Sequence, residues 1–151
     1  MTPLPCRLWY CRNVPIEMLK SSPTLGENKA PWFEKLVEDT KINGLASPLM
    51  VCNGHDGGIE RQFPMRVTCG MNRLQALRKL GWTTVPCLVS HNIPEGVPGV
   101  ELRTREEGQA YLRDGFLCII KSGVRVNQTV HPESEKYPQT EGRYWPEEPN
   151  G

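Results

Sequence analysis

The sequence predicts a small α+β (α/β) domain in which helices pack on a compact mixed sheet. Two observations lead to this prediction. Residues 31–89 follow the order helix, hairpin, helix, strand. A chain of 151 residues also has room for one real core, because a domain of this size buries roughly 68–70% of its unfolded surface. We expect one domain over residues 1–130, in which residues 14–90 form the core with the most recognisable sequence pattern.

The first helix is predicted from an amphipathic stretch that begins at Pro31. Apolar residues recur at helical spacing from Trp32 to Val37, and charged residues fill the opposite face. Proline suits the first turn of a helix, and Asn43-Gly44 supplies residues that tolerate a left-handed backbone. The helix is therefore expected to end at this pair.

A hairpin is predicted next. Pro48–Cys52 is a short apolar run typical of a buried strand, and residues 53–58 (NGHDGG) are typical of a loop. Ile59–Cys69 then has the composition of a returning strand, in which Pro64 marks an edge or a break.

A second helix and another strand complete this series. Gly70 opens the helix, leucines occupy every third position from Leu74 to Leu80, and Gly81 stands where a C-terminal cap belongs. Thr83–Val89 (TTVPCLV) then has the composition of a strand. The helix thus begins directly after the strand that ends at Cys69.

The flanking regions give weaker patterns. Residues 7–16 suit short strand segments interrupted by Pro15, and residues 91–99 suit a loop. Thr104 begins a capping-box spacing, which predicts a third helix ending at Asp114-Gly115. Residues 116–126 are expected to form a small hairpin.

The segment 131–151 differs in composition from the rest. It holds four prolines and many polar residues, and few side chains in it could be buried except Tyr137, Tyr144 and Trp145. We expect a tail that is flexible, or ordered only against a partner.

Charge and cysteine content limit the classes of function. The net charge is +1, which gives no bulk attraction to nucleic acid or to an anionic membrane. The six cysteines form no C-x-x-C pair, so we expect no structural zinc site and reduced thiols, although an even count leaves disulfides open. No stretch approaches 18 apolar residues. We therefore expect a cytoplasmic protein without membrane contact.

The strand-to-helix junction at Gly70 is the segment best suited to binding a ligand. A helix start directs N–H groups and partial positive charge outward, which favours anions. Gly70 permits close approach of a phosphate, Asn72 offers an amide and Arg73 adds a planar cation. A purely structural role remains the alternative, in which Gly70 makes a tight turn, Asn72 caps the helix and Arg73 is solvated.

Four segments together resemble the ParB/sulfiredoxin superfamily, of which this chain would be a stand-alone member. Their order and spacing cover about half of the chain. The segments are V-P-I-E-M-L (Val14–Leu19), W-F-E-K-L-V-E-D-T-K-I-N-G (Trp32–Gly44), S-P-L-M-V (Ser47–Val51) and C-G-M-N-R-L-Q-A-L-R-K-L-G-W-T-T-V-P (Cys69–Pro86).

The resemblance implies a nucleotide-binding domain whose G-x-x-R segment holds phosphates, here Gly70, Met71, Asn72 and Arg73. ATP or CTP with Mg²⁺ would be the ligand. An NTPase or a kinase-like phosphotransferase would be the activity, in a DNA-related process of a phage, plasmid or other mobile element. Met71 stands where sulfiredoxins carry their catalytic cysteine, so sulfiredoxin activity is not expected. The acid of the typical ParB sequence G-E-R-R is also missing, which puts CTP hydrolysis in question.

The resemblance also points to the loop before the first helix. Glu27-Asn28-Lys29 resembles the E-N-P-R of ParB proteins without its proline and arginine. Lys20, Asn28 and Lys29 are therefore candidate phosphate contacts, and Glu27 is the candidate catalytic or magnesium-binding acid. Solvated loop lysines are the alternative.

A second class of function is a non-catalytic module that binds DNA or a protein. Nothing after Val89 is long or helical enough to supply the DNA-reading and dimerisation regions of full ParB proteins. A local basic patch could still contact a DNA backbone, and the tail could serve a homodimer or another protein partner. The patch would comprise Arg61, Arg66, Arg73, Arg78 and Lys79.

Overall fold

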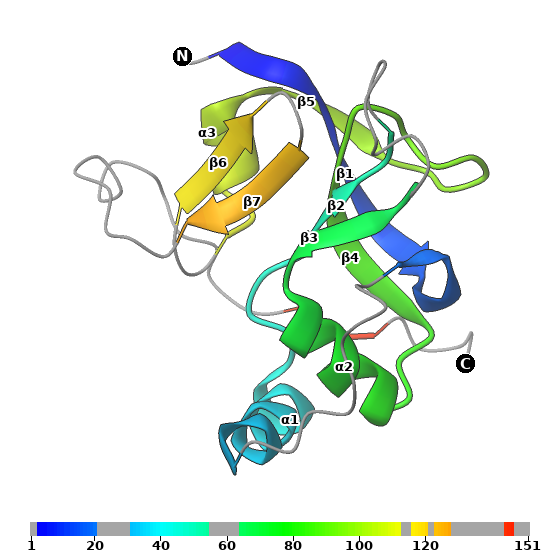
Figure 1. The fold of residues 1–151 in the computed structure, drawn as a ribbon, viewed down its shortest axis with the longest axis vertical. Helices are drawn as coiled ribbons and strands as arrows, with labels where there is room; N and C mark the ends of the chain where they lie inside the picture. Colours follow the sequence, from blue (N-terminus) through cyan, green and yellow to red (C-terminus); the bar gives the residue numbers. More distant parts are fainter. Residues whose placement is uncertain are drawn as a thin grey trace.

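The computed structural model describes residues 3–20, 31–54, 64–112, 116–120, 123–127 and 144–146. In this part of the chain, helices separate a first strand and three successive pairs of strands (Figure 1). The elements are β1 (Pro3–Pro15), η1 (Ile16–Met18), α1 (Pro31–Asn43), β2 (Leu49–Cys52), β3 (Arg66–Cys69), α2 (Met71–Lys79), β4 (Thr84–Ser90), β5 (Val100–Thr104), α3 (Arg105–Gln109), β6 (Phe116–Ile120) and β7 (Gly123–Asn127).

Five of the strands form one mixed sheet in the order β3-β2-β4-β1-β5. β2 and β4 run parallel, and the other neighbouring strands are antiparallel. The remaining two strands, β6 and β7, form a separate hairpin. This arrangement confirms the predicted α+β class and its mixed sheet.

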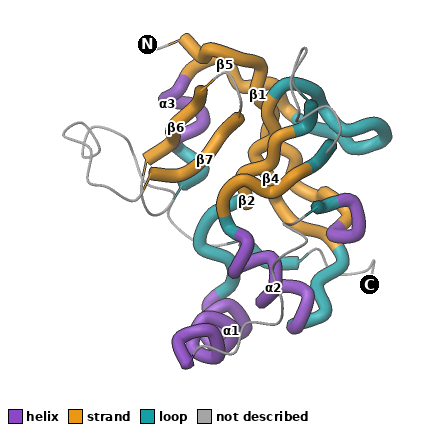
Figure 2. The backbone as a smooth tube through the Cα atoms, in the orientation of Figure 1, coloured by secondary structure: helices purple, strands orange, loops and turns teal. Residues whose placement is uncertain are grey.

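Both faces of the large sheet are covered. One face packs against α2 in a helix-side core that includes Trp9, Leu49, Val51, Leu74 and Val89. The other face packs against α3 and the β6–β7 hairpin, and Figure 2 shows this hairpin beside the sheet. Its hairpin-side core comprises Leu8, Met50, Leu88, Leu102, Leu112, Leu117 and Val124.

The burial of both faces explains why β2 and β4 read as continuous apolar runs. Neighbouring residues of a strand point to opposite faces, so both members of each pair are buried when both faces are covered. All four residues of β2 are buried, as are six of the seven residues of β4. The pairs divided between the two cores include Leu8 and Trp9, Met50 and Val51, and Leu88 and Val89.

The first two predicted helices, α1 and α2, are confirmed, and they pack on each other. α1 ends at Asn43, and Gly44 follows with a φ of 84°. Phe33 and Val37 of α1 form a small core with Ala76 of α2. An ion pair between Glu34 Oε1 and Lys79 Nζ, 2.8 Å apart, lies at the rim of this contact.

The structure corrects two expectations for the flanking regions and adds one strand that was not predicted. β1 is one continuous strand in which Pro15 is the last residue, and its irregularity is a bulge between Cys11 and Val14. β5 was not predicted, because its edge position leaves only Leu102 and Thr104 buried. The third predicted helix ends at Gln109, well before Asp114-Gly115.

The early end of α3 has a local cause. Tyr111 and Leu112 donate their N–H groups three residues back, to Gly108 and Gln109, so the helix tightens into turns. The predicted N-cap at its start is present, since Glu107 N–H donates to Thr104 Oγ1 at 3.2 Å and Thr104 Oγ1 donates to Glu107 Oε1 at 3.3 Å. The predicted β6–β7 hairpin is present too.

Buried and half-buried thiols are expected to make the domain less stable in alkali. Burial raises the pKa of Cys6 and of Cys11 from 9.0 to about 11, and burial also raises the pKa of Cys87. Between the ordinary thiol pKa of 9.0 and the raised value of about 11, the folded chain binds more protons than the unfolded chain. The free energy of unfolding therefore falls as pH rises through this range. We expect the urea midpoint to fall from pH 8 to pH 10. An unchanged midpoint over this range would contradict the burial of the thiols.

Candidate functional site

The predicted phosphate turn lies where β3 ends and α2 begins. Gly70 is the N-cap of α2 and adopts a left-handed conformation, with φ 101° and ψ 22°. A Cβ atom at this position would lie 2.7 Å from Leu49 Cδ2. Glycine is thus required here both for the backbone conformation and for the close approach of Leu49.

Leu49 fixes the turn to the sheet. It is the first residue of β2, is 1% exposed and pairs with Cys87 in the parallel β2–β4 register. The turn therefore lies at the amino end of the parallel pair and is supported from below by the helix-side core.

The three residues after Gly70 have different surroundings. Met71 is half-buried and packs on the helix-side core, so its side chain anchors the helix. Asn72 is exposed and Arg73 is half-buried. Gly70, the N-cap residue of α2, has no side chain that could cap the helix. The first turn therefore keeps the partial positive charge that attracts anions.

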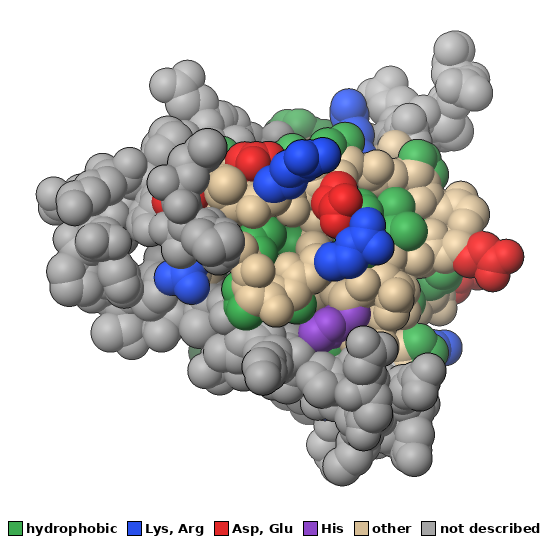
Figure 3. Space-filling model, turned by 90° about the horizontal axis from the view of Figure 1, so that it is seen from above, with side chains coloured by type: hydrophobic (Ala, Val, Ile, Leu, Met, Phe, Trp, Pro, Cys, Tyr) green, Lys and Arg blue, Asp and Glu red, His purple; other side chains and the backbone are tan. Residues whose placement is uncertain are grey.

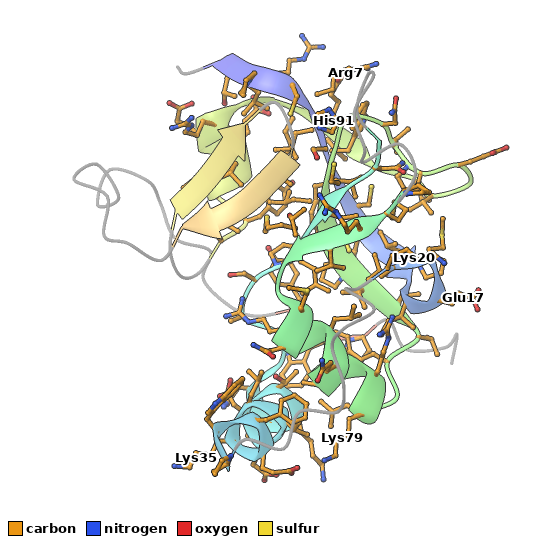
Figure 4. The ribbon with its side chains drawn as sticks, viewed as in Figure 1. Arg7, Glu17, Lys20, Lys35, Lys79 and His91 are labelled. Atoms are coloured by element: carbon orange, nitrogen blue, oxygen red, sulfur yellow. The ribbon has the colours of Figure 1, made fainter. Side chains whose placement is uncertain are left out.

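Among the candidate phosphate contacts that precede the first helix, Lys20 is the one that the structure describes, and its backbone lies away from the turn. Lys20 pairs with Arg66, through Lys20 N–H to Met65 O at 2.9 Å and Val67 N–H to Lys20 O at 2.8 Å. Arg66 is at the opposite end of β3 from Gly70, roughly 13 Å along the strand. Figure 4 shows Lys20 beside η1. The loop candidates Glu27, Asn28 and Lys29 lie outside the described residues.

Two members of the proposed DNA patch take part in internal contacts. Arg78 Nη2 donates to Leu19 O at 3.2 Å, which ties α2 to the end of η1. Lys79 pairs with Glu34 of α1, as noted above. Arg61 lies outside the described residues. The basic residues of α2 thus stabilise helix packing as well as carrying charge.

The carboxyl ends of β2 and β4 hold a polar clasp that the sequence did not reveal. Asn53 Nδ2 donates to Asn92 O at 2.8 Å, and Asn92 Nδ2 donates to Asn53 O at 3.1 Å. His91, the residue that follows β4, has a φ of 77°, and its N–H donates to Arg7 O. Only the pairing of β2 with β4 brings the two asparagines together, so no local pattern signals the clasp.

Charges of both signs surround this clasp. Arg7 Nε lies 2.8 Å from Glu101 Oε2, and this contact lowers the pKa of Glu101. Figure 3, which views this end of the molecule, shows acidic and basic side chains interspersed. Figure 4 places His91 close to Arg7 at the same end. Among the described residues at this end, the mixed charges do not form the basic surface that nucleic-acid binding requires.

Metal ligands do not cluster in the described ranges. No group of three or more His, Cys, Asp or Glu side chains there could hold an ion. Magnesium bound with a nucleotide needs only one or two carboxylates, and the one proposed from the sequence, Glu27, is not described. Among the helices of the described residues, none combines the length and apolar character that a membrane crossing requires.

Comparisons with known proteins add no assignment. No protein-family model matches the chain, and no curated protein is similar to it in sequence.

Proposed function

We propose that the chain is a ParB-like domain that binds a nucleotide through its phosphates at the Gly70–Arg73 turn. The observation that carries the proposal is the conformation of Gly70. Its left-handed backbone, with Leu49 directly beneath, turns the chain from β3 into α2 within one residue. A helix start built in this way is suited to a phosphate group. The superfamily resemblance of the same segment supports this ligand class.

The roles of the residues follow from their positions. First-turn N–H groups of α2 would donate to phosphate oxygens, Asn72 would add an exposed amide, and the Arg73 guanidinium would balance the charge. The side chain of Met71 would take no part, because it packs on the core. ATP or CTP with Mg²⁺ would supply the reactive phosphoryl group, and positioning with charge stabilisation would assist its hydrolysis or transfer.

Nucleotide binding is expected to raise the melting temperature. At a ligand concentration of ten times Kd the stabilisation is about 1.4 kcal/mol, or roughly 3–6 °C for a domain of this size. Thermal shift with ATP, CTP, GTP and UTP, each with and without Mg²⁺, measures it. Arg73→Ala is expected to abolish the shift. Arg103→Ala is the matched control, because Arg103 is exposed on β5 at the opposite edge of the sheet.

The same experiment separates the proposal from the non-catalytic alternative. No shift with any of the four ribonucleotides would reject nucleotide binding. A salt-dependent gel shift of DNA that nucleotides leave unchanged would favour a DNA-binding module instead. The internal contacts of Arg78 and Lys79 make this second outcome the less favoured one.

A further inference from the structure

Of the C-terminal residues that the structure describes, 144–146, Tyr144 makes the contacts with the domain that follow. Tyr144 N–H donates to Leu45 O, and Leu45 N–H donates to Tyr144 O, both at 2.8 Å. The pair forms an isolated antiparallel bridge. Leu45 follows α1 and is buried in the helix-side core. The bridge therefore adds a short piece of strand to the connection between α1 and β2.

The side chain of Tyr144 has its own partners on the domain. Its hydroxyl donates to Tyr111 O at 2.9 Å. Its ring lies 6.4 Å from the ring of Tyr10, which in turn stacks on Tyr111 at 4.1 Å. Tyr144 also packs against the helix-side core. The backbone, the hydroxyl group and the ring of Tyr144 thus each contact the domain.

The two described residues that follow Tyr144 contribute little to this contact. Trp145 is 56% exposed, and Pro146 is exposed as well. Sixteen residues separate Asn127 from Tyr144. A tether of that length reaches up to roughly 55 Å when extended, so it does not dictate where Tyr144 lies. Within residues 144–146, the hydrogen bonds and ring contacts with the domain are made by Tyr144.

We infer that Leu45 and the Tyr10–Tyr111 pair form a peptide-docking site for an extended segment with one anchoring tyrosine. In the intact chain residues 144–146 occupy it as a detachable strap. Strand addition supplies the backbone hydrogen bonds of such a site, and a tyrosine anchor supplies its specificity. This inference is independent of the phosphate turn.

The test uses the full-length chain with Tyr144→Ala, which vacates the site. A fluorescent peptide with the sequence of residues 139–149 (QTEGRYWPEEP) is expected to bind this variant saturably, as measured by anisotropy. The wild-type chain, whose site is filled, should bind it at least about tenfold more weakly, or 1.4 kcal/mol. The same peptide with Tyr144→Ala should lose binding, and with Trp145→Ala should keep it. No binding to a folded Tyr144→Ala chain would overturn the inference.

Hydrogen exchange in the wild-type chain gives a second test that needs no substitution. If the strap detaches without global unfolding, the amides of Leu45 and Tyr144 should exchange together, at least about tenfold faster than the amides inside β4. Exchange of these two amides only through global unfolding would overturn the inference, even if Tyr144→Ala failed to fold.

Discussion

Replacing Gly70 with alanine is expected to lower the free energy of unfolding by about 2–4 kcal/mol. Two costs add at this position. The left-handed conformation, at φ 101°, disfavours any residue with a Cβ atom. The new Cβ would also lie 2.7 Å from Leu49 Cδ2, so the buried leucine has to move. Urea denaturation followed by circular dichroism measures the change.

Gly81→Ala is the matched control for this prediction. Gly81 also has a positive φ, 80°, but a Cβ there would meet nothing within 4 Å. It should therefore show only the conformational cost, about 1–2 kcal/mol. Equal losses at the two glycines would contradict the close approach of Leu49. Where Gly70→Ala still folds, its nucleotide shift should also decrease if the turn binds phosphate.

The elements that could be predicted from the sequence are those with local signals. α1 has a proline in its first turn and Asn43-Gly44 at its end, and both signals act within a few residues. The predicted helix start at Gly70 likewise depends on adjacent residues. Local chemistry was sufficient in these places because the tertiary structure reinforces it.

The parts that could not be predicted depend on pairing between distant segments. β5 is an edge strand that forms by pairing with β1. Most of its residues are exposed, so its sequence lacks the apolar pattern of a buried strand. Lys20 is a candidate phosphate contact by sequence, but the backbone of Lys20 pairs with Arg66 at the other end of β3. The docking of Tyr144 on Leu45 spans 99 positions. No pattern within one segment carries that information.

The second large effect on the free energy of unfolding is expected at the hydrogen bond that joins α3 to the β6–β7 hairpin. Gln109 is fully buried, and its Oε1 accepts the N–H of Leu117 at 2.7 Å. Leu117 is itself buried in the hairpin-side core. A buried N–H group that loses its acceptor costs about 1–3 kcal/mol, and a cavity adds to this cost. Gln109→Ala is therefore expected to lower the free energy of unfolding by about 2–4 kcal/mol.

Gln109→Leu separates the two contributions. Leucine nearly preserves the volume but cannot accept a hydrogen bond, so this variant should show mainly the cost of the unpaired Leu117 N–H, about 1–3 kcal/mol. Urea denaturation gives both losses, and the exchange rate of the Leu117 amide reports directly on the bond. Because this bond joins α3 to β6, exchange at Leu117 should accelerate more than exchange inside β4. A Leu117 amide that stays fully protected in both variants would show that Gln109 is not its acceptor.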